Sequence, residues 1–250
     1  MRWLTFLTFL FAFCNLFAQD VKQSYSQLFQ VQYGANLPSG DLAKRYGFLN
    51  HVGGGLTLVD SKKNLFGIES SFIFGNKFKS EFDSVFSGLV DSQGNITDIN
   101  GDIAVVMVYA RGFYANATVG KLIPLSQKFK ASHLQLNFGL GYLQHRFRIE
   151  TNRQVVPQIE TNYRKGYDRF TTGINTSQFI GYAFLPEEGF YQFFVGIYTL
   201  QGFTYNRRAI NFDQPDVPVS KDLRLDLQFG IRAGWYIPFY KAQPRDYYFE

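Results

Sequence analysis

Cysteine is almost absent from this chain: Cys14 is the single one among 250 residues. It lies in a short apolar run that follows Arg2 and ends at Ala18, the pattern of a secretory signal peptide. We expect cleavage after Ala18, which leaves a mature chain without cysteine and excludes a disulfide framework and any Cys-based metal or redox site. Lipidation of Cys14 is disfavoured because Phe13, rather than a small residue, precedes it.

Other features are also scarce. Mean hydropathy is only −0.14, so no helical membrane span is expected beyond the leader. The net charge is +5 without a long block of Lys or Arg, which argues against a nucleic-acid partner. The three histidines, His51, His133 and His145, show no metal-ligand spacing, and no nucleophile elbow or phosphate loop is present. We therefore expect no enzyme activity, no metal and no cofactor.

Alternation of apolar and polar residues is abundant, and it is clearest in residues 223–237. Every odd position there is apolar, whereas the even positions include Arg224, Asp226, Gln228 and Arg232. Successive side chains of a β-strand point to opposite faces. Such a strand has one apolar face for lipid and one polar face for a lumen, as in an outer-membrane β-barrel.

Eight segments alternate in this way. They are residues 27–37, 49–59, 65–75, 109–123, 134–149, 170–184, 191–205 and 223–237. Short connections at 60–64, 124–130 and 185–189 alternate with long ones at 38–48, 76–108, 150–169 and 206–222. The sequence therefore predicts an all-β fold: an eight-stranded antiparallel transmembrane β-barrel with four long extracellular loops and short periplasmic turns.

This fold sets the expected domain organisation and location. The leader is residues 1–18, a periplasmic segment covers 19–26, the outer-membrane barrel covers 27–240, and 241–250 form a periplasmic tail. The expected location is the bacterial outer membrane.

The fifth segment contains a puzzle. His145, Phe147 and Ile149 fall on the face that is polar in the first half of the segment, yet Phe147 and Ile149 are apolar. A β-bulge near Leu143 would explain it. We prefer the alternative that the strand leaves the hydrocarbon here and that its outer face becomes polar. Arg146 and Arg148 then point outward at the height of anionic lipid headgroups, although plain solvated arginines are an equal alternative.

Charged residues at inward positions predict a filled lumen. They are Glu69, Arg224, Asp226 and Arg232. An eight-stranded barrel is just wide enough for side chains, and buried charges need partners. We expect a salt-bridged polar network that plugs the barrel; a narrow ion path or small-ligand site is the alternative.

The long loops offer a candidate extracellular binding surface, which includes the two outward arginines of the fifth segment. Its residues are Arg146, Arg148, Arg153, Tyr163, Arg164, Lys165, Tyr167, Arg207 and Arg208. A basic, tyrosine-containing surface suits outer-membrane lipid, lipopolysaccharide or a protein partner in the envelope; an ordinary charged loop is the alternative. Loop 76–108 is too apolar to be free, and it forms a lid, extends a hairpin as a β-ribbon, or docks on a neighbouring protein.

A second alternative is a lipid-modifying or proteolytic barrel enzyme, since some small outer-membrane barrels are enzymes. Catalysis needs a general base near a nucleophile or water. His51 and His145 fall on the extracellular side and could approach each other or Asp41, whereas His133 falls at the periplasmic end. Nothing in the sequence brings them together.

Four motifs resemble small outer-membrane barrels of Bacteroidota, the PorT-like group. They are residues 34–41 (GANLPSGD), 139–148 (GLGYLQHRFR), 165–170 (KGYDRF) and 229–235 (FGIRAGW). The resemblance covers roughly residues 25–240 and implies an OmpA/OmpX-like eight-stranded barrel, with some relatives assisting secretion or other envelope assemblies. It assigns no functional residue. We expect a non-enzymatic structural or accessory component of an envelope assembly, in secretion or outer-membrane biogenesis.

Overall fold

The computed structural model describes residues 26–79, 85–160, 162–186 and 191–238. The predicted leader (1–18) and its cleavage site, the segment 19–25 and the predicted tail (241–250) lie outside the described residues. Among the described residues, no helix has the length and apolarity needed to cross a membrane.

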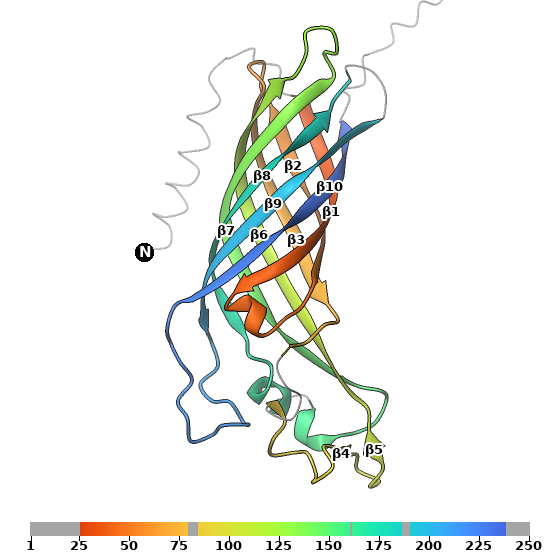
Figure 1. The fold of residues 1–250 in the computed structure, drawn as a ribbon, viewed down its shortest axis with the longest axis vertical. Helices are drawn as coiled ribbons and strands as arrows, with labels where there is room; N and C mark the ends of the chain where they lie inside the picture. Colours follow the sequence, from red (N-terminus) through yellow and green to blue (C-terminus); the bar gives the residue numbers. More distant parts are fainter. Residues whose placement is uncertain (1–25, 80–84, 161, 187–190, 239–250) are drawn as a thin grey trace, which may run out of the picture.

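Eight long antiparallel strands close into a barrel in the order β1-β10-β9-β8-β7-β6-β3-β2 (Figure 1). The strands are β1 (Ser26–Gly40), β2 (Leu49–Val59), β3 (Asn64–Gly75), β6 (Val106–Pro124), β7 (Ser132–Thr151), β8 (Thr171–Phe184), β9 (Gln192–Asn206) and β10 (Arg224–Pro238). Each matches one predicted segment, and no end differs by more than three residues. The predicted eight-stranded antiparallel barrel is therefore confirmed.

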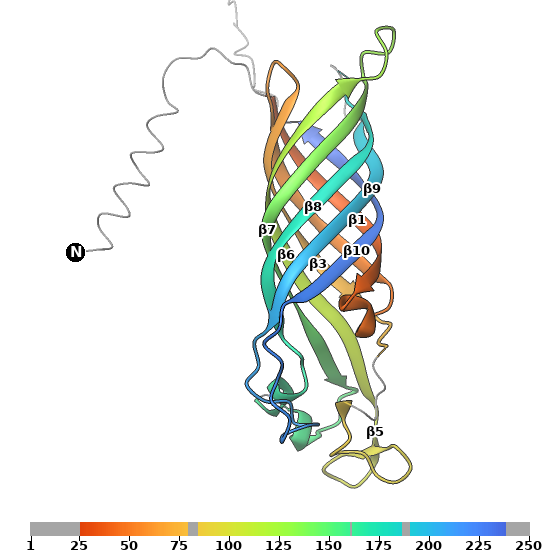
Figure 2. The same cartoon turned by 60° about the vertical axis from the view of Figure 1, so that its left-hand side comes forward.

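The two ends of the barrel differ. At the turn end, short connections join β2 to β3, β6 to β7 and β8 to β9, and both β1 and β10 have their outer termini there. At the loop end, lower in Figures 1 and 2, the other four connections carry the short 3-10 helices η1 (Leu42–Lys44), η2 (Pro157–Ile159) and η3 (Tyr163–Gly166) and the two-residue strands β4 (Ile96–Thr97) and β5 (Ile103–Ala104). Loop lengths are thus sorted by end, as the sequence predicted.

The barrel wall is apolar outside and polar inside. Large apolar side chains exposed on the outer face include Phe29, Val31, Tyr33, Val52, Leu56, Phe66, Ile68, Phe72, Phe113, Val119, Phe138, Leu140, Ile174, Ile180, Ile197, Phe229 and Ile231. Buried polar side chains on the inner face include Gln30, Gln32, Asn36, His51, Glu69, Asn116, Gln135, Asn175, Asp226 and Arg232. This distribution of apolar and polar side chains is the reverse of that in a water-soluble protein, and it suits a wall surrounded by hydrocarbon.

The register of β7 settles the puzzle of the fifth segment. Its pairing with β6 runs without interruption from Val106↔Thr151 to Pro124↔His133, so no bulge occurs near Leu143. His145, Phe147 and Ile149 stay on the inner side and are buried, whereas Arg146 and Arg148 are exposed outside. The bulge alternative is wrong, and the preferred interpretation of a strand that outruns the apolar belt is correct.

Beyond the barrel rim, β6 and β7 continue as a two-stranded ribbon, because Val106–Tyr109 pair with Arg148–Thr151 where neither β3 nor β8 reaches. Loop 76–108 and loop 150–169 fold against this ribbon around a second apolar core. Its buried members are Val85, Phe86, Ile96, Ala104, Ile149, Val156, Ile159 and Tyr167. We call this folded unit the cap. The apolar loop thus joins a hairpin extended as a ribbon, one of the three predicted outcomes.

Candidate functional site at the loop end

Midway along the lumen, one ion pair crosses the barrel. Nη1 of Arg232 on β10 donates to Oε2 of Glu69 on β3 at 2.9 Å, and each side chain is 4% exposed. Nη2 of the same guanidinium donates to the hydroxyl of Tyr114 at 2.5 Å, and its Cζ lies 3.3 Å from the ring centroid of Tyr198. The cation is therefore enclosed by one carboxylate and two aromatic rings from three other strands, β3, β6 and β9.

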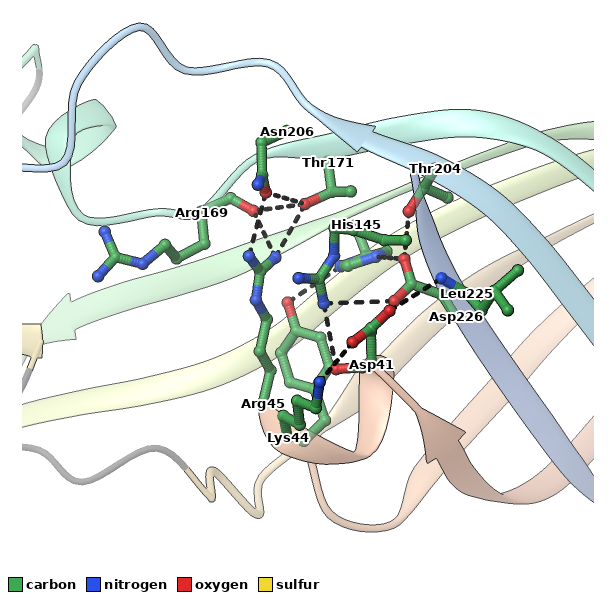
Figure 3. A network of polar contacts seen from close by, with 12 residues as sticks. Asp41, Lys44, Arg45, His145, Arg169, Thr171, Thr204, Asn206, Leu225 and Asp226 are labelled. Atoms are coloured by element: carbon green, nitrogen blue, oxygen red, sulfur yellow. Dashed lines mark hydrogen bonds and ion pairs between the residues drawn. The ribbon is translucent and has the colours of Figure 1, made fainter. Parts of the chain in front are cut away.

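A second polar cluster lies at the mouth of the barrel and is centred on Asp226 (Figure 3). Oδ2 of Asp226 accepts from Nε2 of His145 at 2.8 Å and also from the hydroxyl of Thr204. A carboxylate only accepts, so the imidazole proton lies on Nε2, and Nδ1 accepts from the hydroxyl of Tyr46 at 3.3 Å. Arg224 lies 3.5 Å from Oδ1 of Asp226. Asp226 therefore joins β7, β9 and β10.

Helix η1 is fastened to β10 by Asp41, its N-terminal neighbour. The backbone N–H of Leu225 donates to Oδ2 of Asp41 at 3.0 Å, and Arg224 donates to its backbone oxygen at 3.1 Å. Lys44 donates to Oδ1 at 2.7 Å. The hydrogen bond from Lys44, followed by that from the Leu225 backbone, lowers the pKa of the Asp41 carboxyl.

Arg45 links η1 to the opposite rim of the mouth (Figure 3). Its guanidinium donates to the backbone oxygen of Arg169 at 3.2 Å, to Oγ1 of Thr171 at 2.9 Å and to Oδ1 of Asn206 at 3.1 Å. All three acceptors are neutral. Burial, followed by repulsion from Arg224, lowers the pKa of Arg45 to about 10, so the group still carries its charge at neutral pH.

Aromatic side chains seal the mouth above this cluster. Tyr46 is buried, and its ring packs edge-on against Phe147 with centroids 5.4 Å apart. Phe78 also packs edge-on against Phe147, with centroids 4.9 Å apart. The cavity left between Leu42, Tyr46 and His145 measures about 10 Å³, which is at the lower limit for one water molecule. Tyr46, Phe78 and Phe147 therefore fill this part of the mouth.

Two ion pairs hold the long loops of the cap together. Arg208 donates to both carboxylate oxygens of Asp168, at 2.8 Å and 2.5 Å, and its Cζ lies 5.1 Å from the ring centroid of Phe170. Arg169 donates to Asp213 at 2.5 Å. Both pairs connect loop 150–169 to loop 206–222. Loop 206–222 is thereby fastened to the cap.

The structure divides the predicted binding surface. Exposed members are Arg146, Arg148, Arg153, Tyr163, Lys165 and Arg207. Arg148 pairs with Glu150 at 2.5 Å, and Arg164 donates to the backbone oxygen of Ile159 at 3.1 Å. Arg208 forms the ion pair with Asp168 that connects loop 206–222 to loop 150–169. Tyr167 is a correction: at 5% exposure it belongs to the apolar core of the cap, where its ring lies 5.4 Å from Phe86.

The four predicted inward charges form two separate clusters. Glu69 and Arg232 form the central pair, whereas Arg224 and Asp226 lie at the mouth. The histidines are equally separate: His51 lies 2.7 Å from Oε1 of Gln228, and His145 contacts Asp226 rather than Asp41. His133 contacts the backbone oxygen of Ala131 at the turn end. None of the described residues forms a group of three or more His, Cys, Asp or Glu suited to a metal ion.

Sequence reasoning missed Tyr46, Arg45, Thr204 and Tyr198, which complete the two clusters. Tyr46 and Arg45 fall in a loop, where side-chain direction has no period to reveal it. Tyr198 and Thr204 hold inward positions of β9, and their parity is the signal that could have found them.

A closed barrel with an apolar wall and a filled polar lumen defines the class: an integral β-barrel of the outer-membrane type. No family model matches the chain, and no curated protein matches it.

Solved structures similar to it are themselves outer-membrane barrels. One is Neisserial surface protein A, at 11% identity and TM-score 0.40, over 86% of this chain and 99% of that one. Another is Ail of Yersinia pestis, at 11% identity and TM-score 0.36, over 86% and 99%. A third is a major outer membrane protein of Thermus thermophilus, at 10% identity and TM-score 0.35, over 84% and 99%. Likeness this weak bears on neither ligand nor partner.

Proposed function

We propose that this protein is a non-enzymatic outer-membrane barrel that presents its cap to a protein partner, as a structural or accessory component of an envelope assembly. The observation that carries the proposal is the contrast between a filled lumen and an elaborate exterior end. Both inward charge clusters are occupied by internal partners, and the mouth is sealed by Tyr46, Phe78 and Phe147. A barrel built this way supports display on the cell surface better than conduction.

The far end of the cap carries an apolar patch. Ile99, Ile103, Val105 and Val155 are each 46–66% exposed. Backbone and side-chain hydrogen bonds hold them together: the N–H of Ile99 donates to the oxygen of Val155 at 3.0 Å, and Gln154 bonds both Val105 and Ile103. We call these four residues the tip patch. A cluster of exposed aliphatic side chains on an ordered scaffold is typical of a protein-binding surface.

A pair of arginines supports the proposed contact with outer-membrane lipid and lipopolysaccharide. Arg111 on β6 and Arg146 on β7 face each other directly across the ladder on the outer wall. They line a surface pocket of about 260 Å³ with Phe72, Phe113 and Phe170. Like charges in opposite positions repel, and a lipid phosphate between them would remove the repulsion while the aromatic side chains meet the acyl region.

Burial also supports the absence of catalysis. Tyr46, His145 and Asp226 form a hydrogen-bonded chain that resembles a base and its orienting acid. All three are buried, at most 4% exposed, so a substrate could not reach the tyrosine hydroxyl. The chain therefore suits a structural role at the mouth. A place near secretion or biogenesis machinery of the PorT-like group remains part of this proposal.

Affinity purification of the full chain from outer membranes in mild detergent tests the role of the tip patch. We expect a defined envelope protein to co-purify with the wild type and to be lost with Ile99→Ser/Ile103→Ser. The matched control is Ile210→Ser/Val217→Ser, which removes two exposed aliphatic side chains from another loop.

Loss of the partner in the tip variant alone would support the proposal. Recovery of the barrel alone from wild-type membranes, or of the same partner with both variants, would overturn it.

A further inference from the structure

Four polar side chains lie on the outer wall of the barrel at half its height. Thr176 and Gln178 belong to β8, and Thr199 and Gln201 belong to β9; all four occupy outward positions. The pairing of β8 with β9 runs from Thr171↔Asn206 to Phe184↔Phe193, and Gln178↔Thr199 is at its middle. We call these residues the outer quartet.

The surroundings of the outer quartet are apolar. Nearby side chains exposed on the same wall are Phe138, Leu140, Ile174, Ile180, Ile197, Phe229 and Ile231. Outward aromatic residues bracket it, with Tyr182 and Phe193 toward the turn end and Tyr205 toward the loop end. Among the described outward residues at this height, only Ser70 on β3 is also polar. The quartet therefore faces the middle of the hydrocarbon layer.

The hydrogen bonds within the outer quartet do not use all of its N–H donors. Oε1 of Gln178 accepts from the hydroxyl of Thr199 at 2.5 Å and from Nε2 of Gln201 at 2.9 Å. Oε1 of Gln201 accepts from Thr176 at 2.9 Å. Within the described part of the chain, no acceptor meets Nε2 of Gln178, whose two N–H groups remain without a partner. Lipid chains offer no acceptor, so another polypeptide is the natural source of one.

We propose that the outer quartet is the centre of an interface with a second copy of this chain inside the membrane. The quartet is complementary to itself: Nε2 of Gln178 is a surplus donor, whereas Oε1 of Gln201 and the oxygen of Thr176 each have spare acceptor capacity. A two-fold axis through the quartet lets each copy donate to the other. Interchain hydrogen bonds between amide side chains stabilise such contacts in membranes.

The shape of the wall agrees with this axis. Copies of one barrel insert in the same orientation, so their two-fold axis runs along the membrane normal. Such an axis brings the β7 side of one copy against the β10 side of the other. A surface hollow of about 610 Å³ extends from Gln178 and Thr199 of the quartet across β7, where Phe66, Val119 and Leu136 line its far part. On the β10 side, Phe229 and Ile231 are exposed, at 55% and 61%.

The hollow and these two exposed side chains both adjoin the outer quartet. Gln178 pairs with Phe138, which lines the hollow, and Thr199 pairs with Phe229. In the proposed symmetric contact, the exposed β10 side chains of each copy lie against the hollow of the other, once on each side of the axis. This inference requires only that the barrel is embedded in lipid; it does not depend on the tip patch, so either can fail without the other.

Cross-linking in intact outer membranes tests the interface. In a Cys14→Ser background, Thr199→Cys places one thiol beside the proposed axis, and Ser70→Cys places a thiol on β3, away from the quartet on the same wall. We expect a cross-linked dimer of the chain with Thr199→Cys and monomer with Ser70→Cys. Monomer with both variants, a cross-link to a different protein, or equal dimer with both would overturn the proposal.

A second experiment removes the hydrogen bonds without relying on a thiol. Gln178→Leu/Gln201→Leu should weaken association in lipid bilayers by about tenfold, as expected for the loss of two interchain hydrogen bonds. The side chains point away from the lumen, so the heat-dependent gel mobility of the folded barrel should stay unchanged, and Ser70→Leu is the matched control. Unchanged association of the double variant would contradict the assigned role.

Discussion

The central ion pair offers the sharpest test of the barrel interior, and Glu69→Gln is the perturbation. The substitution keeps the shape of the side chain but removes the charge that faces Arg232 at 2.9 Å. Arg232 then remains 4% exposed, with a tyrosine hydroxyl and an aromatic ring as its main partners. Removing one member of a buried ion pair costs about 3–5 kcal/mol of unfolding free energy, and we expect a loss in that range.

Two further variants separate charge from packing. Adding Arg232→Met to Glu69→Gln removes both charges, and most of the lost stability should return because no buried charge is left alone. Glu150→Gln removes the carboxylate of an exposed pair, since Arg148 is 55% exposed. That control should cost less than about 1 kcal/mol.

The measurement is urea unfolding in lipid vesicles, followed by tryptophan fluorescence. Trp235 on β10 is the only tryptophan outside the predicted leader, so the signal reports the barrel wall three residues from Arg232. Gel mobility before and after heating gives an independent measure of the folded fraction. If Glu69→Gln destabilised the barrel no more than Glu150→Gln, the central charges would be hydrated, and the description of a filled lumen would be wrong.

Two further predictions concern the loop end. Gly166→Ala should destabilise the cap by about 1–3 kcal/mol, because the new Cβ would overlap the ring of Phe212. Trypsin should then cut loop 150–169 faster while the barrel stays folded. Gly88→Ala is the control and should change nothing, because its Cβ would meet no atom within 4 Å. Acidification should release η1 from β10: the pKa of Asp41 is lowered in the folded state, so its stabilisation is present above the ordinary carboxyl value and disappears as pH falls below about 4. Hydrogen exchange at the Leu225 amide should show this, and Asp41→Asn should remove the pH dependence; an unaltered profile in that variant would assign the effect to another group.

The strands could be predicted from the sequence because their signal is local. A period of two over ten residues fixes which side chains share a face, and β7 kept that parity through His145 although its outer face changed from lipid to polar surroundings. The lengths of the connections, which are also a local property of the sequence, distinguished the turn end of the barrel from the loop end. Inward charges such as Glu69 and Arg232 were therefore placed on the correct side of the wall without knowledge of their neighbours.

Partners across the lumen could not be predicted in this way. Tyr46 meets His145, and Arg232 meets Tyr114, only after the sheet has closed, and 99 and 118 residues separate the members of these pairs. Tyr167 shows the converse error, because a tyrosine among basic residues suggests a surface position until Phe86 from another loop covers it. Loop segments lack a period, so contacts between loops leave no regular mark on the sequence.

The outer quartet shows where alternation itself becomes ambiguous. In the middle of β8, Thr176 and Gln178 on the outside alternate with Asn175 and Ser177 on the inside, so both faces are polar. Only the closed barrel distinguishes an amide on the lumen side from an amide in hydrocarbon.

The two kinds of amide differ in what surrounds them. Gln178 on the outer wall has lipid on one side and only its own quartet on the other, whereas Asn116 inside the barrel donates to the hydroxyl of Ser177 on β8. Because both charged clusters of the lumen have partners within the chain, we look to the outer wall and the cap for contacts with other molecules. The polar residues retained against lipid therefore indicate an interaction more directly than the charges that are paired inside the lumen.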